Sequence, residues 1–338
     1  MRLVPPTLLR AAVTILFSMT CALAPAATAL AHNGTGGSSS DYRIQITGFD
    51  GDATGITLRI VELGNRLELH RTSAQTVMVH GYSGEPYLRL DASGVSENDN
   101  SPAHYLDLDR FASTNPPATA SATADPAWTT IADGSTVRWH DHRAHWMSMT
   151  PRADVISDPD VERVIFDANR VDMVIDGRPV SAIIRVTWLP KPDRYIWLGA
   201  AALGGLAIAS VFVLGPGTER ILGFVALDGA IAALLGQGGS TTRHILGAVV
   251  IAVALLATLI RRPLLSVAAA ITAGALAATR IEVFEHELLA GWLPAVGQRI
   301  GVTIAIALCL GVVASALVGA LGPTTERSPS PTVGRGQS

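Results

Sequence analysis

Three of the nine histidines fall within six residues, at His140, His142 and His145, and Met147 follows them directly. Imidazole nitrogen binds zinc, copper, iron and nickel, whereas thioether sulfur favours Cu(I). A mixed set of His and Met ligands without thiolate fits copper better than zinc. This segment therefore predicts a transition-metal site with copper as the cofactor.

The spacing of these histidines sets a geometric condition on such a site. If residues 136–142 form a strand, His140 and His142 point to the same face, because side chains alternate along a strand. His145 would lie on the opposite face, and it could join the pair only if the chain turned just before it. The carboxylate of Asp141 could then orient an imidazole N–H as an outer partner.

The same segment also supports an interpretation without metal. Trp139 and Trp146 flank it, and Arg143 could stack between their rings. The histidines would then belong to a buried polar network, or to a surface that docks a partner protein. The sequence leaves both interpretations open.

An export signal is predicted at residues 1–31. Arg2 and Arg10 provide a basic start, an apolar run follows, and Ala29-Leu30-Ala31 has the small residues that signal peptidase requires. Cleavage there would make His32 the new N-terminus, whose amine and imidazole can chelate copper together. We therefore include His32 among the candidate ligands.

The second half of the chain predicts a membrane domain at residues 191–322. Only 16% of all residues are charged, against about 25% in soluble domains. Five apolar runs approach the roughly 20 residues that cross a bilayer. They lie near 195–214, 220–236, 244–260, 263–279 and 299–320. We expect a bundle of about five transmembrane helices, followed by a disordered tail at 323–338.

Loop arginines indicate how this bundle is oriented. With the N-terminal domain outside, one group would lie in the cytoplasm: Arg220, Arg261, Arg262, Arg327 and Arg335. This agrees with the positive-inside rule. A smaller group would lie outside: Arg243, Arg280 and Arg299. We expect a multi-pass plasma-membrane protein with an extracytoplasmic N-terminal domain and a cytoplasmic C-terminus.

Two parts of the predicted bundle contain notable polar residues. Asp228 lies near the middle of the second apolar run, where an ionisable group usually faces a partner or a cavity. It could mark an ion path, or it could be bonded to a neighbouring helix. Glu285 and His286 lie in a predicted outer loop, which could receive a metal from the exported domain or could be a solvated interfacial segment.

The exported domain, residues 32–190, has the pattern of short strands. Residues alternate between apolar and polar over 43–46 and 57–60, and Leu63-Gly64-Asn65 predicts a hairpin turn after the second run. Asp176-Gly177 is a second strong turn signal. Such spacing predicts an immunoglobulin-like β-sandwich.

Charge and motifs exclude several classes of function. The net charge of −3 and the lack of a basic cluster argue against a nucleic-acid partner. The sequence contains no glycine-rich phosphate loop, nucleophile elbow or haem-attachment motif, so we expect no enzyme. The expected partners are the lipid bilayer and a metal-trafficking or other envelope protein.

The run from Trp139 to Met147, with Gly-Glu-Pro-Tyr-Leu-Arg at 84–89, resembles a group of exported multi-span membrane proteins of actinobacteria. That group has no established activity, so the resemblance implies no catalytic roles. In outline the chain is also similar to bacterial copper-resistance proteins, which join a copper-binding β-sandwich to a membrane partner. This second likeness is one of architecture only, since fold does not fix function. The function expected from the histidine segment is extracytoplasmic copper handling, and an envelope scaffold or accessory subunit is the alternative.

Overall fold

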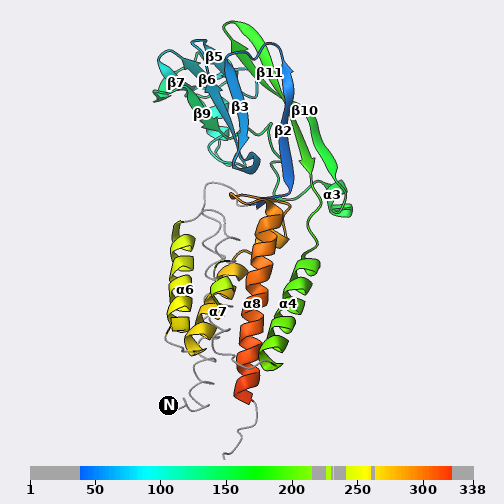
Figure 1. The fold of residues 1–338 in the computed structure, drawn as a ribbon. Helices are drawn as coiled ribbons and strands as arrows, with labels where there is room; N and C mark the ends of the chain where they lie inside the picture. Colours follow the sequence, from blue (N-terminus) through cyan, green and yellow to red (C-terminus); the bar gives the residue numbers. More distant parts are fainter. Residues whose placement is uncertain (1–38, 215–225, 230, 232–240, 260–262, 322–338) are drawn as a thin grey trace, which may run out of the picture.

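The computed structural model describes residues 39–214, 226–229, 231, 241–259 and 263–321. The predicted signal peptide, His32 and the predicted tail at 323–338 lie outside these residues, as does most of the predicted span at 220–236. Figure 1 shows a β-rich domain at one end of the molecule and a group of helices at the other.

The β-domain consists of two antiparallel sheets. The larger sheet has seven strands, in the spatial order β2 (Tyr42–Asp50), β11 (Arg178–Trp188), β10 (Arg163–Ile175), β5 (Val77–His80), β6 (Pro86–Asp91), β7 (Gly94–Asn98) and β8 (Trp128–Ala132). The smaller sheet has three, in the order β3 (Ile56–Val61), β4 (Arg66–Arg71) and β9 (Thr136–Trp139).

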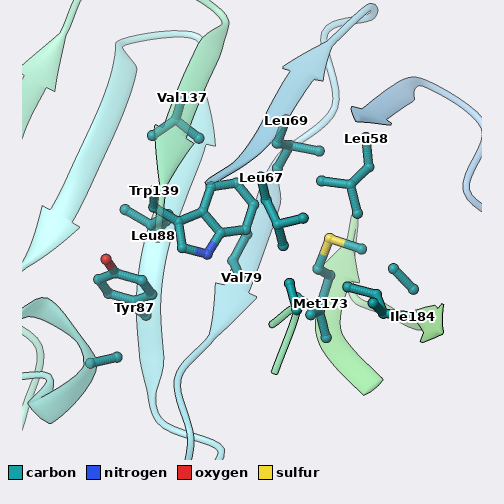
Figure 2. Close-up of a cluster of buried hydrophobic side chains, with 14 of the residues drawn as sticks. Leu58, Leu67, Leu69, Val79, Tyr87, Leu88, Val137, Trp139, Met173 and Ile184 are labelled. Atoms are coloured by element: carbon teal, nitrogen blue, oxygen red, sulfur yellow. The ribbon is translucent and has the colours of Figure 1, made fainter. Parts of the chain in front are cut away.

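One hydrophobic core lies between the two sheets. Figure 2 shows Leu67 and Trp139 of the smaller sheet packed towards Val79, Leu88 and Met173 of the larger one, and all five are at most 5% exposed. Each such side chain stabilises the fold by about 1.5–3 kcal/mol when buried. The expected β-rich domain is therefore present. Its sheets hold seven and three strands, unlike the four and three of an immunoglobulin constant domain.

Both predicted hairpin turns occur. A short 3-10 turn, η2 (Glu62–Gly64), joins β3 to β4, and Gly64 has a φ of 91°. This left-handed conformation favours glycine, and a Cβ atom on Gly64 would lie 1.9 Å from Cδ1 of Ile44, so that side chain would have to move. Asp176 and Gly177, with φ values of 47° and 78°, join β10 to β11.

The described residues of the apolar half form four long helices: α4 (Arg194–Leu214), α6 (Thr241–Leu259), α7 (Pro263–Ala278) and α8 (Ala295–Leu321). Among the described residues, only α4 and α8 are long and apolar enough to cross a membrane. Within these residues, two of the five expected spans therefore meet the criterion. The apolar windows of α6 and α7 are shorter, Gly247–Leu256 and Val267–Ala278.

Small residues allow α4 and α8 to pack closely. Cβ atoms built on Gly205 and Gly311 would lie 2.8 Å from Cβ of Leu310 and 2.5 Å from Cγ2 of Ile208. Small residues at helix interfaces let backbones approach in this way. The two helices that pack closely through these glycines are also the two that are long and apolar enough to cross a membrane.

The β-domain contacts the helices through its first residues. Strand β1 (Ser39–Ser40) pairs with β12 (Leu288–Leu289), which lies between η3 (Ile281–Phe284) and α8. Asp41, 6% exposed, accepts hydrogen bonds from Nδ1 of His286 and the amide of Glu287, both at 2.9 Å. Figure 1 shows this junction between the two parts of the molecule.

Candidate functional site

The histidine segment is a turn rather than a continuous strand. Strand β9 ends at Trp139, so the expectation that His140 and His142 share one strand face is wrong. The carboxylate of Asp141 ends the strand because it accepts a hydrogen bond from the amide of Arg143 at 3.0 Å. The amide of Ala144 then bonds to the carbonyl of Asp141. This is the local pairing by which Asp favours turns.

Each imidazole ring bonds to a different backbone carbonyl. Nδ1 of His140 lies 2.8 Å from the oxygen of Asn65, and Nε2 of His142 lies 3.1 Å from that of Asp109. Nδ1 of His145 lies 3.3 Å from the carbonyl of Trp146. The turn brings His145 beside His142, with ring centroids 5.4 Å apart, but it leaves His140 on the Asn65 side.

The described residues therefore do not fit the expected copper centre. Within these ranges, no three His, Cys, Asp or Glu side chains are grouped so that they could hold a metal ion. Met147 and Met149 are 37% and 87% exposed. Burial lowers the pKa of His140 below its ordinary value, and burial with the nearby Arg110 lowers that of His145 to about 4. The ring of His145 is therefore neutral at pH 7.

Asp141 forms an ion pair with Arg143 and, contrary to expectation, does not orient an imidazole. It is 1% exposed and forms a forked pair with Arg143, at 2.8 and 2.7 Å, while Nε1 of Trp139 donates to it at 3.0 Å. Although burial opposes ionisation, Arg143 holds the pKa of Asp141 below its ordinary value. Arg143 stacks on Tyr82, 5.0 Å from the ring centroid, and not between the two tryptophans.

A second buried acid lies next to this pair. Asp107 accepts a hydrogen bond from the hydroxyl of Tyr82, and Nε2 of His142 is 4.0 Å from its carboxylate. Burial, reinforced by the charge of Asp141, raises the pKa of Asp107 to about 8. No sequence pattern points to this acid, because neither its neighbours nor its spacing distinguish it from a surface aspartate. The network is buried and structural rather than accessible.

A cavity of about 870 Å³ lies at the junction of the β-domain and the helices. Residues from both parts line it, including Tyr42 and Trp188 of the β-domain and His286 of the loop before α8. Trp146 lines it too, and its ring packs against Phe166 with centroids 6.0 Å apart. Ligand cavities commonly have volumes of roughly 300–1,000 Å³. Its volume falls within that range, so we take it as the candidate binding site.

The wall of the cavity is part apolar and part charged. Its apolar side chains include Tyr42, Leu108, Phe111, Trp146, Met149 and Trp188. Its charged side chains are Asp41, Glu62, Arg66, Asp109, Arg110 and Lys191. His140 also faces it, so the cavity and the histidine segment meet at one ring. Sequence patterns could not have predicted it, because its walls come from segments more than 200 residues apart.

The remaining predicted polar residues lie apart from the cavity or at its rim. Asp228 is exposed in the short helical stretch that the structure describes around it. Glu285 is half-exposed, 3.7 Å from Nη1 of Arg194. Nδ1 of His286 hydrogen-bonds to Asp41 directly, so this loop contacts the β-domain.

No family model, curated protein or solved structure matches this chain.

Proposed function

We propose that this chain is a membrane-anchored, extracytoplasmic binding protein that holds a small amphiphilic ligand in the cavity at the junction. The observation that carries this proposal is the composition of the cavity, with aromatic and aliphatic walls beside a few charged groups. Binding sites for small molecules commonly combine these features and lie between domains. The role is non-enzymatic.

In this proposal α4 and α8 cross the plasma membrane, with the β-domain on the outer side. At about 1.5 Å per residue, the 21 residues of α4 and the 27 of α8 extend roughly 30 and 40 Å. The hydrocarbon core of a bilayer is about 30 Å thick. The shorter helices α6 and α7 would lie beside them, and the C-terminus would be cytoplasmic.

The test compares ligand retention in two variants of the full-length protein. Ser148 lines the cavity and is exposed, so Ser148→Trp should fill the entrance. Thr130 is an exposed residue of β8 outside the cavity, so Thr130→Trp is the matched control. Native mass spectrometry of protein purified from membranes should find a bound amphiphile in the wild type and in Thr130→Trp, but not in Ser148→Trp. Equal retention in all three, or none in the wild type, contradicts the proposal.

Copper binding by His140, His142 and His145 stays a separate prediction, which requires these rings to leave their carbonyl partners. A copper titration of the full-length protein tests it, since His140→Ala with His142→Ala should abolish tight binding of about one ion per chain. Docking of an envelope partner is also untested. It predicts a metal-independent pull-down that is lost when Trp146 is changed.

A further inference from the structure

The charged groups of the cavity differ in whether they have a partner within the protein. Each of its three carboxylates has partners close by. Asp41 binds His286 and the amide of Glu287, Glu62 lies 3.7 Å from Arg66, and Asp109 accepts from the amide of Phe111 and the hydroxyl of Ser113. These carboxylates are therefore already occupied by groups of the protein.

Arg110 is the exception among the cations of the cavity. Arg66 and Lys191 each lie 3.7 Å from a carboxylate oxygen, on Glu62 and Asp41 respectively. Arg110 forms no ion pair within the described part of the chain, and its recorded bond is to the amide oxygen of Asn65, at 3.2 Å. Burial lowers the pKa of its guanidinium. A partly buried cation without a counter-ion favours an anionic ligand group.

Two further features of the cavity favour a ligand larger than a simple anion. The cavity, at about 870 Å³, is far larger than a phosphate or carboxylate group needs. Leu108, Phe111 and Met149 line it and are 59%, 48% and 87% exposed, so apolar surface continues to its mouth. An amphiphile would cover this surface and place its charged end at Arg110.

The position of the cavity indicates where such a ligand comes from. Lys191 lines the cavity three residues before α4 begins, and His286 lines it nine residues before α8 begins. If these helices span the membrane, the cavity lies at the outer surface of the bilayer. Exposed Tyr195 and Trp292, both 70% exposed, lie near the same helix ends, as is usual at membrane interfaces.

We infer that the cavity binds an anionic lipid of the outer leaflet, with the headgroup on Arg110 and the hydrocarbon along the aromatic wall. This inference rests on the proposed function and specifies its ligand class. Arg110 would bind the headgroup by charge-assisted hydrogen bonds, which are stronger than neutral ones. The tryptophan and tyrosine rings of the wall would pack against the part of the lipid nearest the headgroup.

The test titrates the full-length protein, in a non-ionic detergent, with three probes. These are a short-chain phosphatidylglycerol, the phosphatidylcholine with the same chains, and inorganic phosphate. We expect saturable binding of phosphatidylglycerol, about tenfold or more tighter than that of phosphatidylcholine, and weaker binding of phosphate than of either lipid. Equal affinity for the two lipids would overturn the inference. Phosphate binding as tight as that of phosphatidylglycerol would assign the site to a free anion and overturn it as well.

Variants of Arg110 identify the residue responsible. Arg110→Gln should remove the preference for phosphatidylglycerol, whereas Arg110→Lys should keep most of it. Arg178 pairs with Asp52 at the far end of the β-domain, so Arg178→Gln should change nothing. An unchanged preference in Arg110→Gln, at an unchanged thermal midpoint, overturns the inference. The wild type could instead retain an uncharged amphiphile that Ser148→Trp does not retain. The proposed function would then stand, and only the inference of an anionic lipid would fail.

Discussion

Asp107 shows how strongly burial controls the chemistry of single residues in this domain. Its carboxyl is 7% exposed, accepts the hydroxyl of Tyr82 and lies near the charge of Asp141. The unfolded carboxyl loses its proton near pH 3.8, whereas the folded one holds it until about pH 8. The stability that it contributes is thus fully present below pH 3.8 and is lost as the pH rises towards 8.

Asp107→Asn should remove this pH dependence. His145 acts in the opposite sense, because its pKa falls from 6.5 to about 4 and stability is lost as the pH falls through that window. Between pH 4 and 6.5 the two groups change the free energy of unfolding in opposite directions. Above pH 6.5 the contribution of His145 is constant, so the remaining pH dependence comes from Asp107. There the wild type should lose on the order of 1 kcal/mol of unfolding free energy per pH unit relative to Asp107→Asn. Thermal midpoints of the full-length protein from pH 6.5 to 8 measure this.

A control separates burial from the mere loss of a negative charge. Asp133 is exposed, so Asp133→Asn should keep the pH profile of the wild type. Parallel profiles for the wild type and Asp107→Asn would show that Asp107 ionises normally in the folded protein.

At the residue scale, the sequence predicted which residues gather at the site better than it predicted the bonds that they form. His142 and His145 do lie side by side, and Trp139 is a core residue. Their bonding could not be predicted, because it depends on Asp141 ending the strand. The partners Asn65 and Asp109 lie in other loops, so no local pattern pointed to them.

At the element scale, the close contact of α4 with α8 depends on glycine. A Cβ atom on Gly311 would lie 2.5 Å from Cγ2 and 2.6 Å from Cβ of Ile208. Gly311→Ala should therefore separate the two helices and destabilise the bundle by about 1–3 kcal/mol, the usual cost of overpacking. Thermal loss of helix, followed by far-UV circular dichroism in detergent, measures the change.

Gly199 is the matched control for this substitution on α4. It is exposed, and a Cβ atom there would meet nothing within 4 Å. Gly199→Ala should leave the midpoint unchanged or raise it slightly, because alanine favours helix over glycine. If both variants behaved alike, helix propensity rather than packing would explain the result.

Elements were the most predictable level of this fold. Period-two alternation and the two turn signals located β2, β3, β10 and β11, because these strands bury one face against a single core. Apolar runs likewise located the four long helices. The number of spans was less predictable, because an apolar run of about 17 residues fits both a short membrane helix and a packed bundle helix.

At the scale of the whole molecule, the arrangement of the two parts was not encoded in any local pattern. Asp41 follows the strand β1, and its partners His286 and Glu287 lie about 245 residues later in the chain. The sequence indicated a polar outer loop there but not what it binds. Arg299 supports that loop, since its guanidinium donates to the carbonyls of Val283 and His286 at 2.9 and 2.8 Å.

Asp41→Asn should loosen the β-domain from the helices without unfolding either part. The change keeps the size of the side chain but removes the charge that faces His286 and Lys191, 2.9 and 3.7 Å away. Spin labels at Thr130 and Ala200, in a cysteine-free background, measure the distance between the β-domain and α4. We expect a broader distance distribution in Asp41→Asn.

Asp52→Asn is the control for this change, because Asp52 is an exposed acid that pairs with Arg178 at the opposite end of the domain. It should keep the narrow distribution of the wild type. A narrow distribution in Asp41→Asn as well would show that the strand pairing of β1 with β12 fixes the junction alone. Because the cavity takes its walls from both parts, loosening the junction should also weaken retention of its ligand. If Asp41→Asn kept a narrow distance distribution but retained less ligand, Asp41 would contact the ligand directly.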